Sequence, residues 1–173
     1  MKNLLVLIIA LFAFFGCGED ESSSTNFKEF SPNEEVKLVD VSGKELTLVR
    51  KDHGFAIKND ENKVLMIDIF GTFCPPCQKE AAELTKYQLE NKDKFTLIGL
   101  THFENVTNEY VLHEFMQKFN AYYFITNDQK INDRLAEQIV RDIEYKHEIA
   151  LPFKVVIKNG EYQILTDVDS GQY

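Results

Sequence analysis

Hydrophobic and polar positions alternate in two short runs near residue 40, and this pattern indicates a β-hairpin. The runs 36–41 and 46–49 flank Ser42-Gly43-Lys44, three residues that favour a turn. Residues 55–58 are expected to add a short strand before a polar turn. Residues 64–70 are almost continuously apolar, as in a central strand that is covered on both faces.

Strand-like and helix-like segments then take turns along the chain. The remaining expected elements are helices at 78–91, 110–119 and 129–147, strands at 95–100 and 122–125, and a hairpin of 153–157 with 162–165 joined by Asn159-Gly160. Pro75 and Pro76 belong to the first turn of the first helix, where a missing N–H is tolerated. Alternating strands and helices predict an α/β fold with a mixed central sheet.

The N-terminal segment differs in pattern from the predicted α/β domain and indicates that the protein is exported from the cytoplasm. Lys2, twelve apolar residues and Gly16-Cys17 resemble a bacterial lipoprotein signal, which implies a signal peptide over 1–16 and lipidation of Cys17. Phe14 departs from the usual motif, where Leu is commoner. An uncleaved anchor and ordinary secretion remain alternatives, and the apolar run is short for spanning a bilayer.

Composition predicts where the folded domain begins and argues against some classes of protein. Residues 17–35 are acidic and Ser-rich, so they predict a flexible tether, and the folded domain is expected over 36–173. A formal net charge of −9 argues against nucleic-acid binding. Three cysteines are too few for a scaffold held together by disulfides.

Cys74-Pro75-Pro76-Cys77 is the segment most informative about chemistry. It lies between the strand at 64–70 and the helix at 78–91, so Cys74 falls at a helix N-terminus, where a thiolate is stabilised. Cys74 is therefore the expected nucleophile and Cys77 the thiol that resolves the mixed disulfide. A structural disulfide or half of a zinc site are the alternatives, but a zinc site needs about four ligands and no second Cys pair exists.

Asp68 lies on the strand that leads into this segment. A carboxyl group buried there would have a raised pKa and could take the proton from Cys77. The alternative is an ordinary polar residue on a strand. The dithiol needs no cofactor, and no metal site is expected.

Two offsets carry a family resemblance. Asp68 precedes Cys74 by six positions and Pro152 precedes Gly160 by eight, as in thioredoxin. The hairpin before the first core strand, the stretch 73–80 and the added helix and strand over 107–126 resemble the TlpA/ResA/CcmG branch of membrane-tethered thiol–disulfide oxidoreductases. The resemblance covers about residues 36–167 and implies a thioredoxin fold with an N-terminal β-hairpin and a helix–strand insertion.

The resemblance also implies roles for single residues. Glu80 would be a second proton acceptor, although a first-turn glutamate is also favoured by the helix dipole. Pro152 would be cis and would leave the Leu151 backbone free to pair with substrate, unless it is only a turn proline that ends the preceding helix. Phe73, expected to contact substrate, stands where the family usually has Trp. Asp68 stands where this branch often has a neutral residue, and the helix before Pro152 is expected to be longer than usual.

By the same resemblance, the expected function is reduction of disulfides in extracytoplasmic proteins. The implied clients are apocytochrome c or a copper-assembly protein, the implied electron donor is a membrane thiol transporter, and a lipid anchor would hold the domain at the membrane. A disulfide oxidase or isomerase is the main alternative. A copper chaperone that uses both thiolates as soft ligands is a third.

Overall fold

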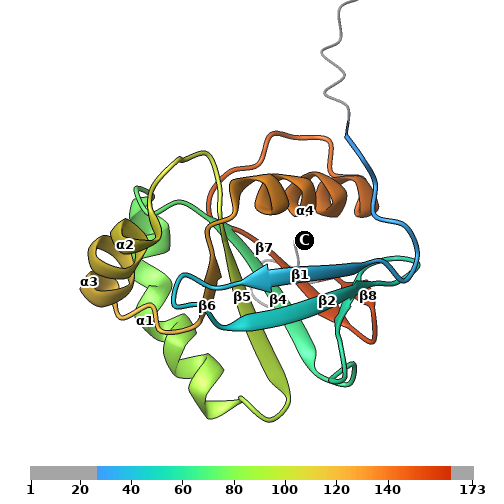
Figure 1. The fold of residues 1–173 in the computed structure, drawn as a ribbon, viewed down its shortest axis with the longest axis horizontal. Helices are drawn as coiled ribbons and strands as arrows, with labels where there is room; N and C mark the ends of the chain where they lie inside the picture. The colour runs from blue at the N-terminus through green and yellow to red at the C-terminus, as the bar shows by residue number, and fades with distance from the viewer. Residues whose placement is uncertain (1–26, 165–173) are drawn as a thin grey trace, which may run out of the picture.

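A five-stranded mixed sheet forms the centre of the protein (Figure 1), in a computed structural model that describes residues 27–164. The strand order is β6-β5-β4-β7-β8. The strands are β4 (Val64–Phe70), β5 (Phe95–Thr101), β6 (Phe124–Thr126), β7 (Phe153–Lys158) and β8 (Glu161–Gln163). β4 pairs parallel with β5 and antiparallel with β7, so the mixed sheet expected from the sequence is confirmed.

The N-terminal hairpin is also confirmed, and it belongs to a separate small sheet. That sheet has the order β1-β2-β3, with β1 (Glu35–Val39), β2 (Glu45–Arg50) and β3 (Phe55–Ile57) all antiparallel. The turn between β1 and β2 is built on Asp40, whose Oδ1 accepts hydrogen bonds from the Ser42 and Lys44 N–H groups, each at 2.8 Å.

Helices lie on both faces of the central sheet (Figure 1). On one side α4 (Gln129–Asp142) and the small sheet enclose the larger apolar cluster, which includes Ile67 and Ile69 of β4. On the other side α1 (Pro75–Glu90) and the helical segment 108–119 enclose a second cluster, which includes Phe70 and both cysteines. Successive strand residues point to opposite faces, so β4 supplies both clusters.

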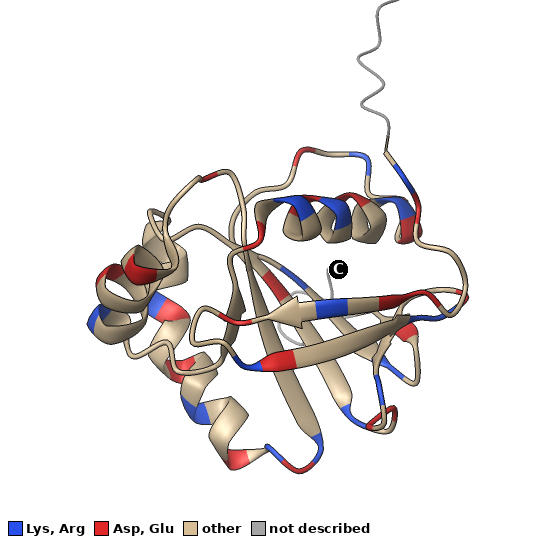
Figure 2. Cartoon of the chain, in the orientation of Figure 1, with Lys and Arg blue, Asp and Glu red and all other residues tan. Residues whose placement is uncertain are grey.

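Charged residues lie mostly outside the strands of the central sheet (Figure 2). Figure 2 shows them along α4 and in the loops, while the central strands are mostly uncharged. A buried charge on a central strand is therefore an exception that needs a physical account.

Two predicted helices differ from the structure. α4 ends at Asp142 rather than at 147, because Glu144 adopts a left-handed conformation (φ 53°) that stops the helix. The helix before Pro152 is therefore shorter than the helix at 129–147 expected from the sequence. The segment 108–119 is helical, but its middle, Val111–Met116, is a π-helix rather than the regular helix that the spacing predicts.

The expected tether boundary at residue 35 is also wrong. Phe30 is 5% exposed, and its N–H donates to Oε1 of Gln138 on α4 at 3.0 Å. Arg134 stacks on the Phe30 ring at 3.6 Å from the centroid and pairs with Glu34 at 2.8 Å. Residues 27–35 are thus docked on the domain. The composition of the segment as a whole predicted a tether because it does not reveal that a single aromatic residue, Phe30, packs against α4. The expected signal peptide, Cys17 and the rest of the tether lie outside the described residues, as do residues 165–173.

Candidate active site

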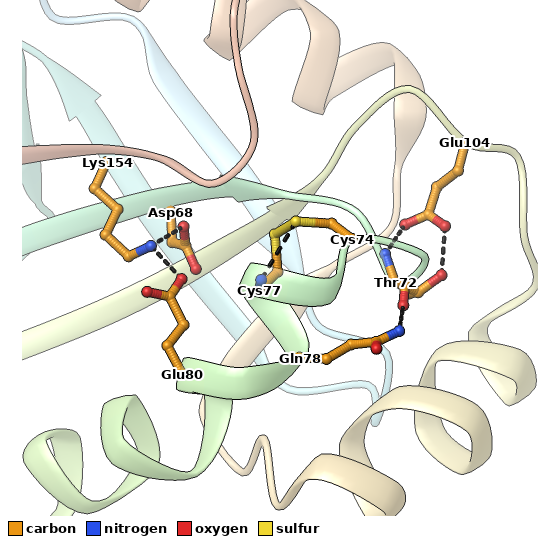
Figure 3. The surroundings of a disulfide bond; sticks show 8 residues. All are labelled: Asp68, Thr72, Cys74, Cys77, Gln78, Glu80, Glu104 and Lys154. Carbon is orange, nitrogen blue, oxygen red and sulfur yellow. Dashed lines mark hydrogen bonds and ion pairs between the residues drawn. A yellow bond between two sulfur atoms is a disulfide. The ribbon is translucent and has the colours of Figure 1, made fainter.

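The two cysteines form a disulfide at the N-terminus of α1 (Figure 3). Cys74 is the N-cap of the helix, and Pro75 and Pro76 occupy its first two positions. Because proline has no N–H, the first free donor of the helix is the Cys77 N–H, which donates to Cys74 Sγ at 3.3 Å. In the reduced protein this donor and the helix dipole would stabilise a Cys74 thiolate.

The turn that leads into Cys74 is held by side chains from two other elements. Glu104, in the loop after β5, accepts from the Thr72 N–H at 2.8 Å and from Thr72 Oγ1 at 2.5 Å. Gln78 of α1 donates from Nε2 to the Thr72 carbonyl oxygen at 2.7 Å. These bonds fix the backbone immediately before the disulfide (Figure 3).

Asp68 lies on the same face of the sheet as the disulfide, and its side chain is 1% exposed. Its direct partner across the β4–β7 pairing is Lys154, whose Nζ lies 3.1 Å from Asp68 Oδ1. The same ammonium contacts Oε1 of Glu80 on α1 (Figure 3). Despite the short distance to Lys154, Asp68 Oδ1 accepts no hydrogen bond of acceptable angle.

Burial raises the pKa of Asp68 to about 6. Lys154 lowers that pKa and Glu80 raises it, but desolvation outweighs both. A carboxyl group with this pKa exchanges its proton near neutral pH, as a proton acceptor for a thiol must.

Tyr123, the residue before β6, lies over Gly99, which is the partner of Asp68 on β5. Gly99 pairs with Asp68, and a Cβ at Gly99 would lie 3.0 Å from Tyr123 Cε2 and 2.9 Å from Phe70 Cε1. Burial, followed by the charges of Asp68 and Glu80, raises the pKa of Tyr123 well above its usual range. Tyr123 therefore remains a neutral wall of the site.

The Leu151–Pro152 peptide bond is cis, as the resemblance implied. Leu151 packs against both apolar clusters, so this loop lies where the two meet. Phe73 is 56% exposed, and its ring covers Gly71, where a Cβ would lie 2.6 Å from Phe73 Cε1. Both segments remain predicted substrate contacts.

The structure brings together four of the predicted residues, Cys74, Cys77, Asp68 and Glu80, around the start of α1 (Figure 3). Sequence reasoning missed Lys154, Glu104 and Thr72. The signal for Lys154 was available: it is a lysine inside an apolar strand, two residues after Pro152. Glu104 gave no signal, since only the folded loop brings it to Thr72.

Within residues 27–164, no three His, Cys, Asp or Glu side chains are grouped as a metal site would require. None of the helices in this range is long and apolar enough to cross a bilayer.

No family model matches the chain, and no curated protein matches it. Solved structures do. A candidate protein disulfide isomerase from Bacteroides thetaiotaomicron is 23% identical, with a TM-score of 0.56 over 80% of this chain and 78% of that one. A thioredoxin-family thiol:disulfide interchange protein from Chlorobium tepidum is 19% identical, with a TM-score of 0.54 over 76% and 81%.

The chain has the thioredoxin fold. StoA from Bacillus subtilis is a further neighbour, 15% identical with a TM-score of 0.52 over 76% of this chain and 86% of that one. In this thioredoxin fold, β4 ends at the disulfide and the cis-proline loop precedes β7, the antiparallel neighbour of β4. The fold therefore accounts for the placement of the dithiol, and the side chains around it decide the chemistry.

Proposed function

We propose that this protein is an extracytoplasmic thiol–disulfide oxidoreductase that reduces disulfides in client proteins. The observation that carries the proposal is the Cys74–Cys77 disulfide at the N-terminus of α1, on the same face of the sheet as the buried carboxyl group of Asp68. A structural disulfide would not require a buried ionisable group on that face. Perturbed carboxyl groups cluster at functional sites.

The reaction uses the reduced dithiol. The Cys74 thiolate attacks one sulfur of a client disulfide, forms a mixed disulfide and releases the other client sulfur as a thiolate. Cys77 then gives its proton to Asp68, and its thiolate attacks Cys74 Sγ. The Cys74–Cys77 bond forms, the bond to the client breaks, and the client leaves with a second thiolate. Two electrons have moved from the dithiol to the client.

The partners follow from the resemblance and from the signal-like N-terminus. We propose that Cys17 carries a lipid anchor and that a membrane thiol transporter reduces the disulfide again. The clients would be apocytochrome c or a copper-assembly protein. An extended client segment would pair with the Leu151 backbone and contact Phe73, which is exposed beside the dithiol.

The direct test traps the client. Cys77→Ala leaves Cys74 able to attack and unable to be released, so disulfide-linked adducts should accumulate in cells. Mass spectrometry should identify extracytoplasmic proteins in adducts that disappear on reduction. Cys74→Ala/Cys77→Ala is the matched control and should trap nothing. Absence of any protein adduct with the single variant would remove the proposed substrate class.

A disulfide isomerase or oxidase is the second candidate, favoured by the neighbour described as a candidate isomerase. The reduction potential of Cys74–Cys77, measured in glutathione or dithiothreitol buffers, separates the two. A value near about −270 mV supports a reductase, whereas about −180 to −120 mV supports an isomerase or an oxidase.

A further inference from the structure

One lysine serves two carboxylates beside the disulfide. Lys154 Nζ lies 3.1 Å from Asp68 Oδ1 and contacts Glu80 Oε1. The Asp68 side chain is 1% exposed, that of Lys154 is 21% exposed and that of Glu80 is 33% exposed. Exposure therefore increases from Asp68 through Lys154 to Glu80, and the ammonium lies between the two carboxyl groups (Figure 3).

The elements packed around Asp68 offer no second cation. β7 contributes Lys154, α1 contributes Glu80 and Cys77, and the segment before β6 contributes the neutral Tyr123. The neighbour on β5 is Gly99, which has no side chain. Among residues 27–164, Lys154 is the one cation within ion-pair distance of Asp68.

We propose that Lys154 is a positioning residue for the resolving step, holding Asp68 as a carboxylate that can accept the Cys77 proton and then remaining paired with Glu80. This inference rests on the proposed function. When Cys77 gives its proton to Asp68, the Asp68 charge disappears and the Cys77 thiolate attacks Cys74 Sγ. Lys154 keeps Glu80 as its anionic partner, so the ammonium is not left unpaired in a half-buried site.

The geometry gives two neighbouring variants opposite effects. Lys154→Met leaves two carboxylates without their shared cation, so Asp68 should hold its proton to higher pH. Glu80→Gln removes the competing carboxylate, so Asp68 should lose its proton at lower pH. If Lys154 only supported packing, Lys154→Met and Glu80→Gln would not shift the titration of Asp68 in opposite directions.

The resolving step can be isolated with an aromatic disulfide. The reduced whole chain reacts with 5,5′-dithiobis(2-nitrobenzoate), and Cys74 releases one coloured thiolate while it retains the other. Attack by Cys77 on this adduct releases the second thiolate, and its rate is followed against pH. A shift of one pH unit in the profile corresponds to about a tenfold change in rate on its acid limb.

We expect Lys154→Met to shift the acid limb of the rate profile to higher pH by at least about one unit. At pH values on that limb, release of the second thiolate should be about tenfold slower than in the parent. Lys154→Arg keeps the charge and should restore most of the rate. Lys158→Met, an exposed lysine on the same strand, is the matched control and should leave the profile unchanged. In an Asp68→Asn background, Lys154→Met should have no further effect on the profile.

Carboxyl ¹³C NMR of Asp68 in the oxidised whole chain provides a second readout that needs no turnover. The inference is overturned if the Asp68 titration in Lys154→Met overlays that of the parent, or if Lys154→Arg behaves as Lys154→Met. Lys154→Gln replaces the Met variant if that one does not fold. A parent protein that never releases the second thiolate would sink the proposed function instead, while the titration would still decide the role of Lys154.

Discussion

Two buried ion pairs lie on opposite sides of the central sheet, and they are built differently. On the α4 side, Arg50 binds Asp142 through two guanidinium nitrogens, and both side chains are less than a tenth exposed. Asp142 also accepts hydrogen bonds from Gln138 Nε2 at 2.8 Å and from Tyr162 Oη at 2.9 Å. This carboxylate is fully occupied, so it joins β2, α4 and β8 and has no capacity left for chemistry.

On the α1 side, Asp68 is more deeply buried and has fewer partners. Its Oδ1 has an ion-pair contact with Lys154 but no well-oriented hydrogen bond, and it shares that lysine with Glu80. A buried carboxyl group without hydrogen bonds is a cost to the folded state. The comparison shows two uses of a buried ion pair. Asp142, with all its hydrogen-bond partners in place, forms a saturated pair that stabilises the fold. Asp68, with few partners, forms an unsaturated pair and can take up a proton.

The largest effect is expected from breaking the saturated pair. Arg50→Met leaves Asp142 buried and charged without its cation, and should lower the free energy of unfolding by about 3–5 kcal/mol. Urea unfolding of the oxidised protein measures this loss. Lys58→Met removes the exposed pair with Glu35 and should cost less than about 1 kcal/mol. Similar losses of unfolding free energy in both variants would show that the buried pair stabilises the fold no more than an exposed one.

A gain in stability is expected from neutralising Asp68, the buried carboxyl group that has few hydrogen-bond partners. The folded-state pKa of Asp68 is about 6, above the unfolded value, so the folded protein binds more protons between about pH 4 and pH 6. The contribution of Asp68 to the free energy of unfolding therefore falls as the pH rises through this window. Asp68→Asn should remove this fall and stabilise the protein at pH 7.5 by up to about 3 kcal/mol, less the lost attraction to Lys154.

Urea unfolding at several pH values between 4 and 8 measures this gain. Asp93→Asn, at an exposed loop position, is the control and should leave the pH dependence in place. A stability gain of Asp68→Asn over the parent that does not grow between about pH 4 and pH 6 would contradict the raised pKa of Asp68.

The smallest effect is expected at the turn before Cys74, where Glu104 resembles Asp142 in being well occupied. Glu104→Gln replaces one acceptor oxygen with a donor that cannot bind the Thr72 N–H or hydroxyl in the same way, at a cost of about 1–2 kcal/mol. Hydrogen exchange at the Thr72 amide should accelerate, while exchange at β7 amides should change little. Uniform acceleration across the sheet would mean that the contact supports the whole fold rather than this turn.

Much of the fold was predictable because its signals are local. The apolar run of β4, the Asn159-Gly160 turn and the two alternating runs of the first hairpin each depend on a few neighbouring residues. The end of α4 was not, because apolar residues continue past Asp142 and the left-handed conformation of Glu144 stops the helix there. The π-helix at Val111–Met116 was missed for a similar reason, since its wider turn breaks the regular helical spacing.

For the candidate site, the sequence alone determined the dithiol, its place between a strand and a helix, and the carboxyl group six residues before it. These are short-range features, and covalent connection is enough to bring them together. Only the tertiary structure decided what surrounds them. The β4–β7 register sets Lys154 opposite Asp68, the loop after β5 brings Glu104 to Thr72, and α4 holds Phe30. Such contacts join residues that are tens of positions apart, and their geometry exists only once the chain has folded.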